Sequence, residues 1–362
     1  MKINKCLFML ICTVCAFAWA TAPAVAQRDV IAFGLSQGDD NGGVGVDVQS
    51  NGVLTNNFKT TGFGGNTNAI GWYSNGTEFT FLTDGTNQFG IQDLNGVVVK
   101  GNDGTGSPGL DLTVLSNDNV VWSLGGASAQ TRNASLTGIV HGPAAFGDGN
   151  IASTEMPNGA VVFLYEDPGS PRTRIRGALP GGNWNGQQDF FDNGFGPGER
   201  AETLSSLPNG NVIIGHDDNG RVSVRPPDGT CCHMNGNLRG AGIGVTDVLG
   251  LPDGNMAVAF SNGDFNIYTG DAPFNSLGGG GGFNITSMAH NPVTNNLVYG
   301  TTSGDIWVRS LDDYSSLSVV ATRNVSNSPI ASIDVTNQIP EPTTGILALF
   351  ASISLVGMRR RS

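Results

Sequence analysis

Acidic side chains are the main groups of this sequence that could do chemistry. Five of them recur on or beside short apolar segments that repeat along the chain, at Asp111, Glu155, Glu202, Asp247 and Asp334. If these segments surround one axis, the carboxylates could together bind a cation such as calcium or polarise a substrate, because hard cations prefer oxygen ligands. Their offsets within the repeats differ, so solvated strand ends are the alternative interpretation.

Other reactive groups are sparse. Cys231 and Cys232 are adjacent, and such neighbours form either a strained vicinal disulfide or two thiols. Two acidic turns, 39–42 and 217–220, offer oxygens to calcium, although turn formation alone explains their Asp, Asn and Gly. The histidines lack metal-ligand spacing, and no hydrolase elbow, zinc-protease, phosphate-loop or Cys-x-x-Cys motif follows residue 26. We therefore expect no catalytic residue and no cofactor, with calcium as the alternative.

The N-terminus has the composition of a secretory signal peptide. Lys2 and Lys5 precede an apolar run over 6–20, and Ala24 and Ala26 form a small-x-small cleavage site before Gln27. We therefore assign residues 1–26 to a signal peptide, leave them out of the fold and expect an exported protein.

The C-terminus carries a segment of three parts. Pro340, Glu341 and Pro342 precede sixteen uncharged residues, and an arginine cluster follows. As a helix this stretch would reach roughly 24 Å, short of the ~30 Å hydrocarbon core, but arginines can snorkel and a bilayer can thin. The arginines would keep this end in the cytoplasm. We expect a short transmembrane helix, with an ordinary single-pass anchor as the alternative.

This arrangement resembles the PEP-CTERM sorting signal of Gram-negative bacteria, and the resemblance covers about residues 339–362, including Arg359, Arg360 and Arg361. It implies that an exosortase-type enzyme recognises the tripeptide, removes the tail and releases or re-anchors the protein at the cell surface. The family is associated with exopolysaccharide and the biofilm matrix. The resemblance therefore implies how the chain is sorted, not what its body does.

The body between the two signals is strongly acidic. Residues 27–339 hold 13 Lys or Arg and 29 Asp or Glu, a formal net charge of −16. Such a surface repels nucleic acid and anionic membranes, so neither is an expected partner of the body. Extracellular polysaccharide or surface proteins are the expected partners, and membrane contact is expected only through the C-terminal helix before processing.

Hairpin units repeat along the body. Leu-Pro-Asn-Gly at 207–210 and Leu-Pro-Asp-Gly at 251–254 each precede an apolar strand, and Asn-Gly or Asp-Gly between apolar runs indicates a tight turn. Seven such strands recur at intervals that average about 44 residues, which suits a four-stranded unit. They begin near Val30, Phe79, Val120, Val161, Val212, Met256 and Leu297.

These repeats predict an all-β, seven-bladed β-propeller over residues 27–337, followed by the sorting segment at 338–362. The chain enters the body on the second strand of a unit, and 330–335 matches the first strand of a unit. The ring should therefore close by pairing the C-terminal strand with the N-terminal one, which brings Ile333 near Val30 and removes two free edges. A linear solenoid and tandem sandwiches are the alternatives.

Two segments interrupt the repeat pattern. We interpret Gly278–Gly282 as a flexible connector between two units. The stretch Gly181–Arg200 is expected to be an insertion whose aromatic rings either contact a ligand or pack on one another. Its aromatic residues are Trp184, Phe190, Phe191 and Phe195.

The predicted function is that of an exported cell-surface or matrix binding module without enzymatic activity. The alternative is a metal-dependent hydrolase or lyase acting on sugars or lactones, in which the five acids would line the channel as in lactonase-like propellers. A structural matrix component without a specific ligand is the third hypothesis. Because propellers host many functions, the fold alone does not decide among them.

Overall fold

The computed structural model describes residues 28–36, 38, 42–84, 88–104, 108–125, 128–145, 148–166, 173–180, 183–191, 200–217, 220–226 and 234–337. Several predicted features lie outside these residues. They are the signal peptide with its cleavage site at Ala24, Ala26 and Gln27, the cysteine pair 231–232, parts of both acidic turns, and the sorting segment with Pro340 and Arg359. Within the described ranges, no helix is both long enough and apolar enough to span a bilayer.

The described strands form seven four-stranded antiparallel sheets within one compact unit, 28–338. Written from inner to outer strand, the first three sheets are β28 (Ile330–Asn337), β1 (Asp29–Leu35), β2 (Gly43–Ser50), β3 (Val53–Thr61); β4 (Thr67–Trp72), β5 (Glu78–Thr83), β6 (Gln88–Asp93), β7 (Val98–Gly104); and β8 (Gly109–Val114), β9 (Val120–Leu124), β10 (Ser128–Arg132), β11 (Ile139–Ala145). The next two are β12 (Asp148–Glu155), β13 (Val161–Glu166), β14 (Thr173–Leu179), β15 (Asn183–Phe191); and β16 (Ala201–Ser206), β17 (Val212–His216), β18 (Arg221–Arg225), β19 (Met234–Asn237). The last two are β20 (Val245–Gly250), β21 (Met256–Phe260), β22 (Phe265–Tyr268), β23 (Ser276–Gly280); and β24 (Ile285–Asn291), β25 (Asn296–Thr301), β26 (Asp305–Ser310), β27 (Val319–Asn324).

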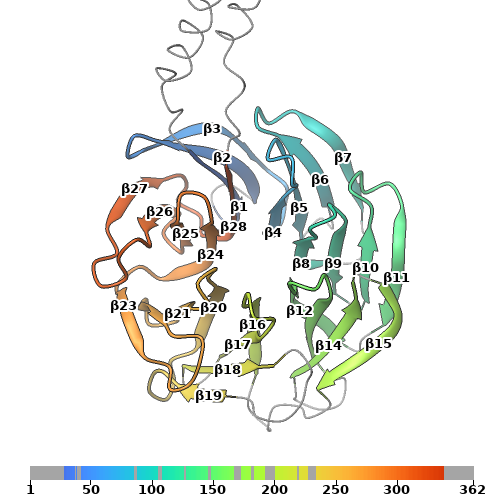
Figure 1. Ribbon diagram of the computed structural model, residues 1–362. Helices are drawn as coiled ribbons and strands as arrows, with labels where there is room; N and C mark the ends of the chain where they lie inside the picture. Colours follow the sequence, from blue (N-terminus) through green and yellow to red (C-terminus); the bar gives the residue numbers. More distant parts are fainter. Residues whose placement is uncertain are drawn as a thin grey trace, which may run out of the picture. The chain divides into compact units, whose positions relative to one another are not determined.

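The sheets stand around a common axis like the blades of a propeller (Figure 1). The inner strands lie around the centre, each beside the inner strand of the next sheet, and β28 lies beside β4. The prediction of an all-β propeller is thus confirmed. The seven apolar strands expected after the turns are the second strands of these sheets, β1, β5, β9, β13, β17, β21 and β25.

One sheet joins the two ends of the described chain. Strand β28 pairs antiparallel with β1, so that Phe33 lies opposite Ile333 and Val30 lies opposite Thr336. The pairing of a C-terminal with an N-terminal strand closes the ring and gives β1 a partner strand on both sides. The linear solenoid and the tandem sandwiches are therefore both wrong.

The turns between first and second strands follow from their sequence. In the turn after β20, Gly254 adopts a φ of 85°, a left-handed conformation that glycine reaches without strain. The Asp253 side chain accepts a hydrogen bond from the backbone N–H of Asn255 at 3.0 Å. Asn209 does the same for Asn211 at 2.9 Å in the turn after β16. The Asn-Gly and Asp-Gly signals therefore mark hairpin turns, as the sequence predicts.

The core lies between neighbouring sheets. Strands β17 and β21 are buried over their whole length, as expected for second strands covered on both faces. Val224 of β18 and Val258 and Phe260 of β21 belong to one apolar cluster that joins two sheets. Burial of such side chains is the main favourable term in folding, and it ties each sheet to the next.

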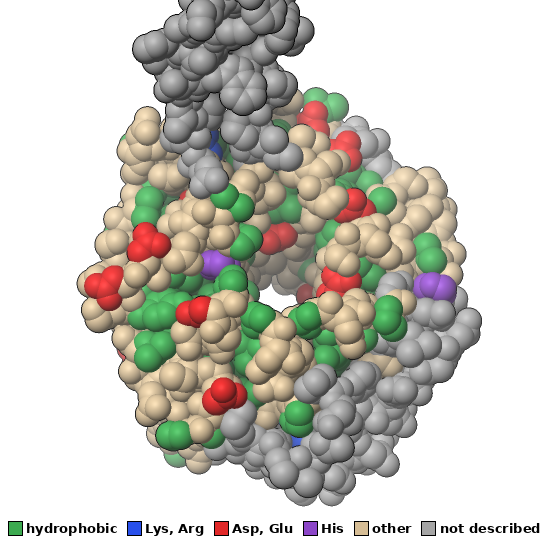
Figure 2. Space-filling model, viewed as in Figure 1, with side chains coloured by type: hydrophobic (Ala, Val, Ile, Leu, Met, Phe, Trp, Pro, Cys, Tyr) green, Lys and Arg blue, Asp and Glu red, His purple; other side chains and the backbone are tan. Residues whose placement is uncertain are grey.

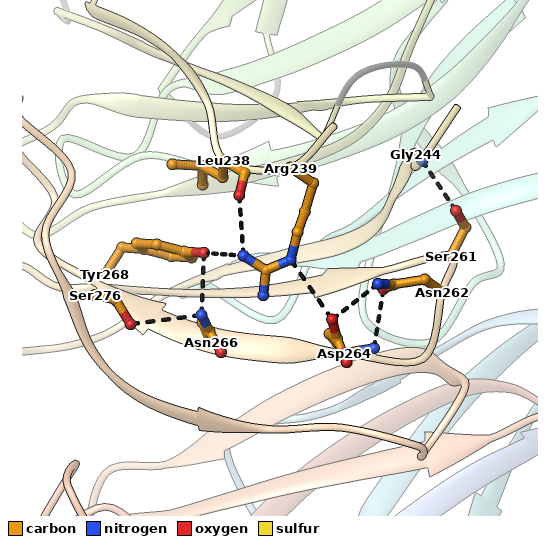
Figure 3. A network of polar contacts seen from close by, with 9 residues as sticks. All are labelled: Leu238, Arg239, Gly244, Ser261, Asn262, Asp264, Asn266, Tyr268 and Ser276. Carbon is orange, nitrogen blue, oxygen red and sulfur yellow. Dashed lines mark hydrogen bonds and ion pairs between the residues drawn. The ribbon is translucent and has the colours of Figure 1, made fainter. Parts of the chain in front are cut away.

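A polar network between the segment after β19 and the next sheet adds to this apolar contact (Figure 3). Arg239, in the segment after β19, donates a hydrogen bond to the Tyr268 hydroxyl at 2.9 Å and lies 3.7 Å from an Asp264 carboxylate oxygen. Its guanidinium also lies 4.3 Å from the centre of the Phe260 ring, within cation–π range. The loop after β19 is thus attached to β21 and β22.

Two expectations about irregular segments are wrong. Residues 278–280 are not a connector but part of the outer strand β23, where Gly279 pairs with Asn266. Close packing explains the glycines, since a Cβ on Gly278 would lie 1.6 Å from the Tyr314 carbonyl oxygen. The stretch 181–200 contains the outer strand β15, which pairs with β14, so it is not simply an inserted loop. The side chains of Trp184, Phe190, Phe191 and Phe195 lie outside the described part of the structure.

Candidate functional site

The inner strands line a central channel. Figure 2 shows an opening at the centre of the molecule. A cavity of about 260 Å³ is lined by residues of all seven inner strands. A second cavity of about 740 Å³ lies beside it, on the side of the turns between first and second strands. Ile70, Leu112 and Ile333 line both cavities, so the larger one is the mouth of the channel.

All five predicted acids lie along this channel. Asp111, Glu202 and Asp247 line the inner cavity, while Glu155 and Asp334 line the mouth. The placement expected from the repeat is therefore found. Their contacts, however, differ from those of a metal centre.

Asp247 joins the inner strand β20 to its neighbours on both sides. One carboxylate oxygen accepts a hydrogen bond from the backbone N–H of Met288 in β24 at 2.7 Å. The other accepts from the Thr203 hydroxyl in β16 at 2.9 Å and from the N–H of Val248 at 2.8 Å. The pKa of Asp247 is raised to about 7, mainly by burial and to a smaller extent by the charge of Asp111, although these hydrogen bonds lower it.

Asp334 makes the equivalent connection where the ring closes. Its carboxylate accepts hydrogen bonds from the backbone N–H of Trp72 in β4 and from that of Val335, both at 2.8 Å. Burial raises the pKa of Asp334 to about 6. Asp111 accepts from both the N–H and the hydroxyl of Ser153 in β12, and burial raises its pKa as well. These three aspartates connect inner strands of adjacent sheets.

The two glutamates have separate roles. Glu155 accepts hydrogen bonds from the N–H and hydroxyl of Ser116 at 2.7 and 2.9 Å, which ties β12 to the turn after β8. Glu202 is exposed and lies 3.9 Å from Arg200. Glu202 alone fits the interpretation of a solvated strand residue.

The five carboxylates do not gather into the metal centre that the alternative interpretation would require. Among the described side chains, no three of His, Cys, Asp or Glu lie close enough together to hold a metal ion. The physical reason is that Asp111, Asp247 and Asp334 each turn toward a backbone N–H of a neighbouring strand. The sequence shows the acids at recurring places, but it does not show these partners, because they lie about 40 or more residues away.

The lining of the mouth also contains proline rings and an imidazole, which the sequence analysis did not predict. Prolines of four turns line it, at Pro157, Pro208, Pro252 and Pro292, together with the half-buried His290. Burial lowers the pKa of His290, so this imidazole is neutral at pH 7. The described residues of the mouth include Glu155 and Asp334 but no Lys or Arg. The recurring proline before Asn-Gly or Asp-Gly is the sequence signal that could have identified this rim.

Neither a family model nor a curated protein matches this chain. Solved structures do match it. The chain is similar to a putative 6-phosphogluconolactonase from Bacteroides fragilis NCTC 9343, with 12% identity over 87% of this chain and 99% of that one, at a TM-score of 0.65. It is also similar to the computationally designed Ika8 protein, with 14% identity over 83% of this chain and 90% of that one, at a TM-score of 0.57. At these identities the similarity shows the fold alone.

Proposed function

We propose that this protein is an exported, seven-bladed propeller that acts as a binding module and takes its ligand at the mouth of the central channel. The observation that carries the proposal is the cavity of about 740 Å³, which is lined by residues from all seven sheets. Ligand sites are typically concave, largely apolar and preformed, with a few polar groups. The proline turns and the half-buried His290 fit that description.

The contacts of the acids support binding over catalysis. A general base needs a free oxygen within reach of a substrate proton. Each of Asp111, Asp247 and Asp334 instead accepts two or more hydrogen bonds from backbone or hydroxyl groups. These groups therefore fix the shape of the channel.

The ends of the chain support an extracellular location. The signal peptide at 1–26 would direct export, and the PEP-CTERM-like segment at 338–362 would hold the protein at the inner membrane until an exosortase-type enzyme removes it. The body would then act at the cell surface or in the matrix of a Gram-negative bacterium, with polysaccharide or surface proteins as partners. Mass spectrometry of the secreted protein tests this, because it should begin at Gln27 and lack Arg359, Arg360 and Arg361. A secreted protein that retains both ends contradicts the proposed sorting.

A matched pair of variants tests the binding site. Pro292→Arg places a long cationic side chain at the mouth, whereas Val53→Arg places the same group on the outer strand β3, where Val53 is 60% exposed. The full chain and both variants are applied to a glycan array and to matrix pull-downs. We expect Pro292→Arg to abolish the signal and Val53→Arg to leave it unchanged. Equal signals, or none for the unaltered protein, contradict binding at the mouth.

A hydrolase or lyase acting on sugars or lactones is the second candidate. It is favoured by the similarity to the putative 6-phosphogluconolactonase and by the pKa of Asp247, about 7, which suits proton transfer once a substrate takes the place of one of its hydrogen-bond donors. The described lining of the mouth offers no Lys or Arg to a phosphate, so an unphosphorylated lactone or sugar fits better. Lactone hydrolysis that disappears in Asp247→Asn while folding is kept would support this candidate. Equal turnover in the unaltered protein and this variant would count against it.

A further inference from the structure

We propose that the channel mouth continues outward as a track on both sides of the Pro252–Asn255 turn, and that this track binds a linear amino-sugar chain. The inference rests on the proposed function, because it uses the same face and names the class of ligand.

The geometry of three adjoining cavities carries the proposal. The mouth of about 740 Å³ reaches Leu251 and Pro252. A cavity of about 600 Å³ lies on one side of the turn, between Pro252 and the 269–275 loop after β22. A third cavity of about 280 Å³ is lined by Pro252 and by Tyr314 in the loop after β26. Pro252 lines all three, so the cavities adjoin at this turn, and a ligand longer than one sugar can extend from the mouth into the cavity on either side.

The walls of the track are fixed before a ligand arrives. The Asp253 carboxylate accepts hydrogen bonds from the Asn255 side chain and from the Tyr314 hydroxyl, both at 2.6 Å, which connects the turn to the next sheet. On the other side, the Thr269 hydroxyl accepts from the N–H of Asn275 at 3.0 Å. Such preorganisation lowers the entropic cost of binding.

The negative charge of the lining favours a ligand that carries positive charge. The described residues that line the three cavities include no Lys or Arg. They include five acids, and the carboxylate of one of them, Asp271, receives no hydrogen bond from any described residue. Asp312 is exposed, and hydrogen bonds from Asn295 and Ser310 lower its pKa, so it is ionised at pH 7. A chain that carries ammonium groups is attracted here, and a chain of uronic acids is repelled. The five acids are Glu155, Asp253, Asp271, Asp312 and Asp334.

The neutral groups of the track suit sugars. Asn209, Thr269 and Asn275 offer amide and hydroxyl groups to the 600 Å³ cavity, where sugar hydroxyls can donate and accept. The rings of Pro208, Pro252 and Pro273 line the same cavity and provide apolar surface for the C–H faces of a pyranose. Acidic, amide, hydroxyl and apolar groups therefore line the same adjoining cavities.

The test compares three oligosaccharides of equal length by calorimetry with the full chain. They are a β-1,4-linked glucosamine hexamer, its fully N-acetylated counterpart and an oligouronate. We expect the glucosamine hexamer to bind at least tenfold more tightly than the acetylated one, with affinity that falls as salt is added, and no binding of the oligouronate. Equal binding of the amine and acetylated hexamers overturns the inference, as does equally tight binding of a lysine hexapeptide.

Matched variants locate the site. The pair Asp271→Asn and Asp312→Asn removes two charges from the track, whereas Glu78→Gln removes a charge from β5, which lines none of the three cavities. We expect the double variant to lose at least tenfold in affinity for the glucosamine hexamer and Glu78→Gln to lose less than twofold. If Pro292→Arg abolishes binding of another ligand while the hexamer does not bind, the inference is wrong and the proposed function stands. If no ligand binds at the mouth, both the inference and the proposed function are wrong.

Discussion

The carboxylate of Asp247 lies 2.7 Å from the backbone nitrogen of Met288, and through this hydrogen bond the inner strand β20 is joined to β24. Asp334 in the closing sheet bonds in the same way to Trp72 in the next sheet, and Asp111 bonds to Ser153. A side chain that at first suggests a ligand for a cation therefore connects one sheet to the next. The same contact makes the stability of the ring depend on pH.

Replacement of Asp247 by asparagine should change how stability depends on pH. Burial raises the pKa of Asp247 from its ordinary 3.8 to about 7, so the folded state binds more protons than the unfolded state between these values. Its contribution to stability therefore decreases as the pH rises from about 4 to 7. Between pH 5 and pH 8, Asp247→Asn should gain roughly 2–3 kcal/mol relative to the unaltered protein. Urea unfolding at both pH values measures this difference.

The difference between the two proteins is the useful quantity because histidines act in the opposite direction. Burial lowers the pKa of His216 to about 3 and lowers that of His290, so both oppose stability as the pH falls below 6.5. Their contribution is common to the unaltered protein and the variant and cancels. A gap between the two proteins that is the same at pH 5 and pH 8 would contradict the raised pKa of Asp247.

The ion pair between Arg323 and Asp47 should matter more than an ordinary surface pair. Arg323 of β27 donates to the Asp47 carboxylate in β2 at 2.6 Å, and Asp47 is fully buried. Burial raises the pKa of Asp47, and the charge of Arg323 lowers it. Arg323→Ala leaves a buried carboxylate without its cation, so we expect a loss of about 2–4 kcal/mol in the free energy of unfolding.

A double-mutant cycle checks this assignment. Asp47→Asn removes the buried charge, so Arg323→Ala should cost at least about 1 kcal/mol less in that background than in the unaltered protein. Chemical denaturation of the four proteins gives the coupling. Additive losses would mean that the two side chains do not interact in solution.

The glycine-only part of β23 should not tolerate a methyl group. A Cβ on Gly279 would lie 1.9 Å from the Asn266 side-chain oxygen and 2.3 Å from the Phe265 carbonyl oxygen. Gly279→Ala should therefore destabilise the protein by about 1–3 kcal/mol, the usual cost of overpacking. Gly240→Ala is the control, since no atom lies within 4 Å of its Cβ position. Thermal unfolding compares the two, and equal melting temperatures would argue against the packing of β23.

The sequence contains the repeat but not the contacts between repeats. The strands at Val212 and Met256 follow from Pro-Asn-Gly and Pro-Asp-Gly turns, because turn chemistry and alternation are local. Ring closure could be predicted from the phase of the two ends. The misread run at Gly278–Gly282 has no side chains to alternate, and its strand is determined by tertiary neighbours such as Tyr314. Likewise, nothing near Asp247 in the sequence indicates the N–H of Met288.

The last prediction concerns the anchoring of the first strand. Asp29 is fully buried at the start of β1, and it accepts hydrogen bonds from Asn291 at 2.6 Å, Thr294 at 2.5 Å and Asn296 at 2.7 Å, all in the hairpin of β24 and β25. Asp29→Ala would leave the buried Asn296 amide without this acceptor and would remove one acceptor from each of Asn291 and Thr294, so we expect a loss of about 2–4 kcal/mol. Asp271→Ala removes an exposed aspartate instead and should change stability by less than about 0.5 kcal/mol. Denaturant midpoints for both variants decide the point. If Asp29→Ala unfolds at the same midpoint as Asp271→Ala, the buried cluster does not hold the N-terminal strand in place.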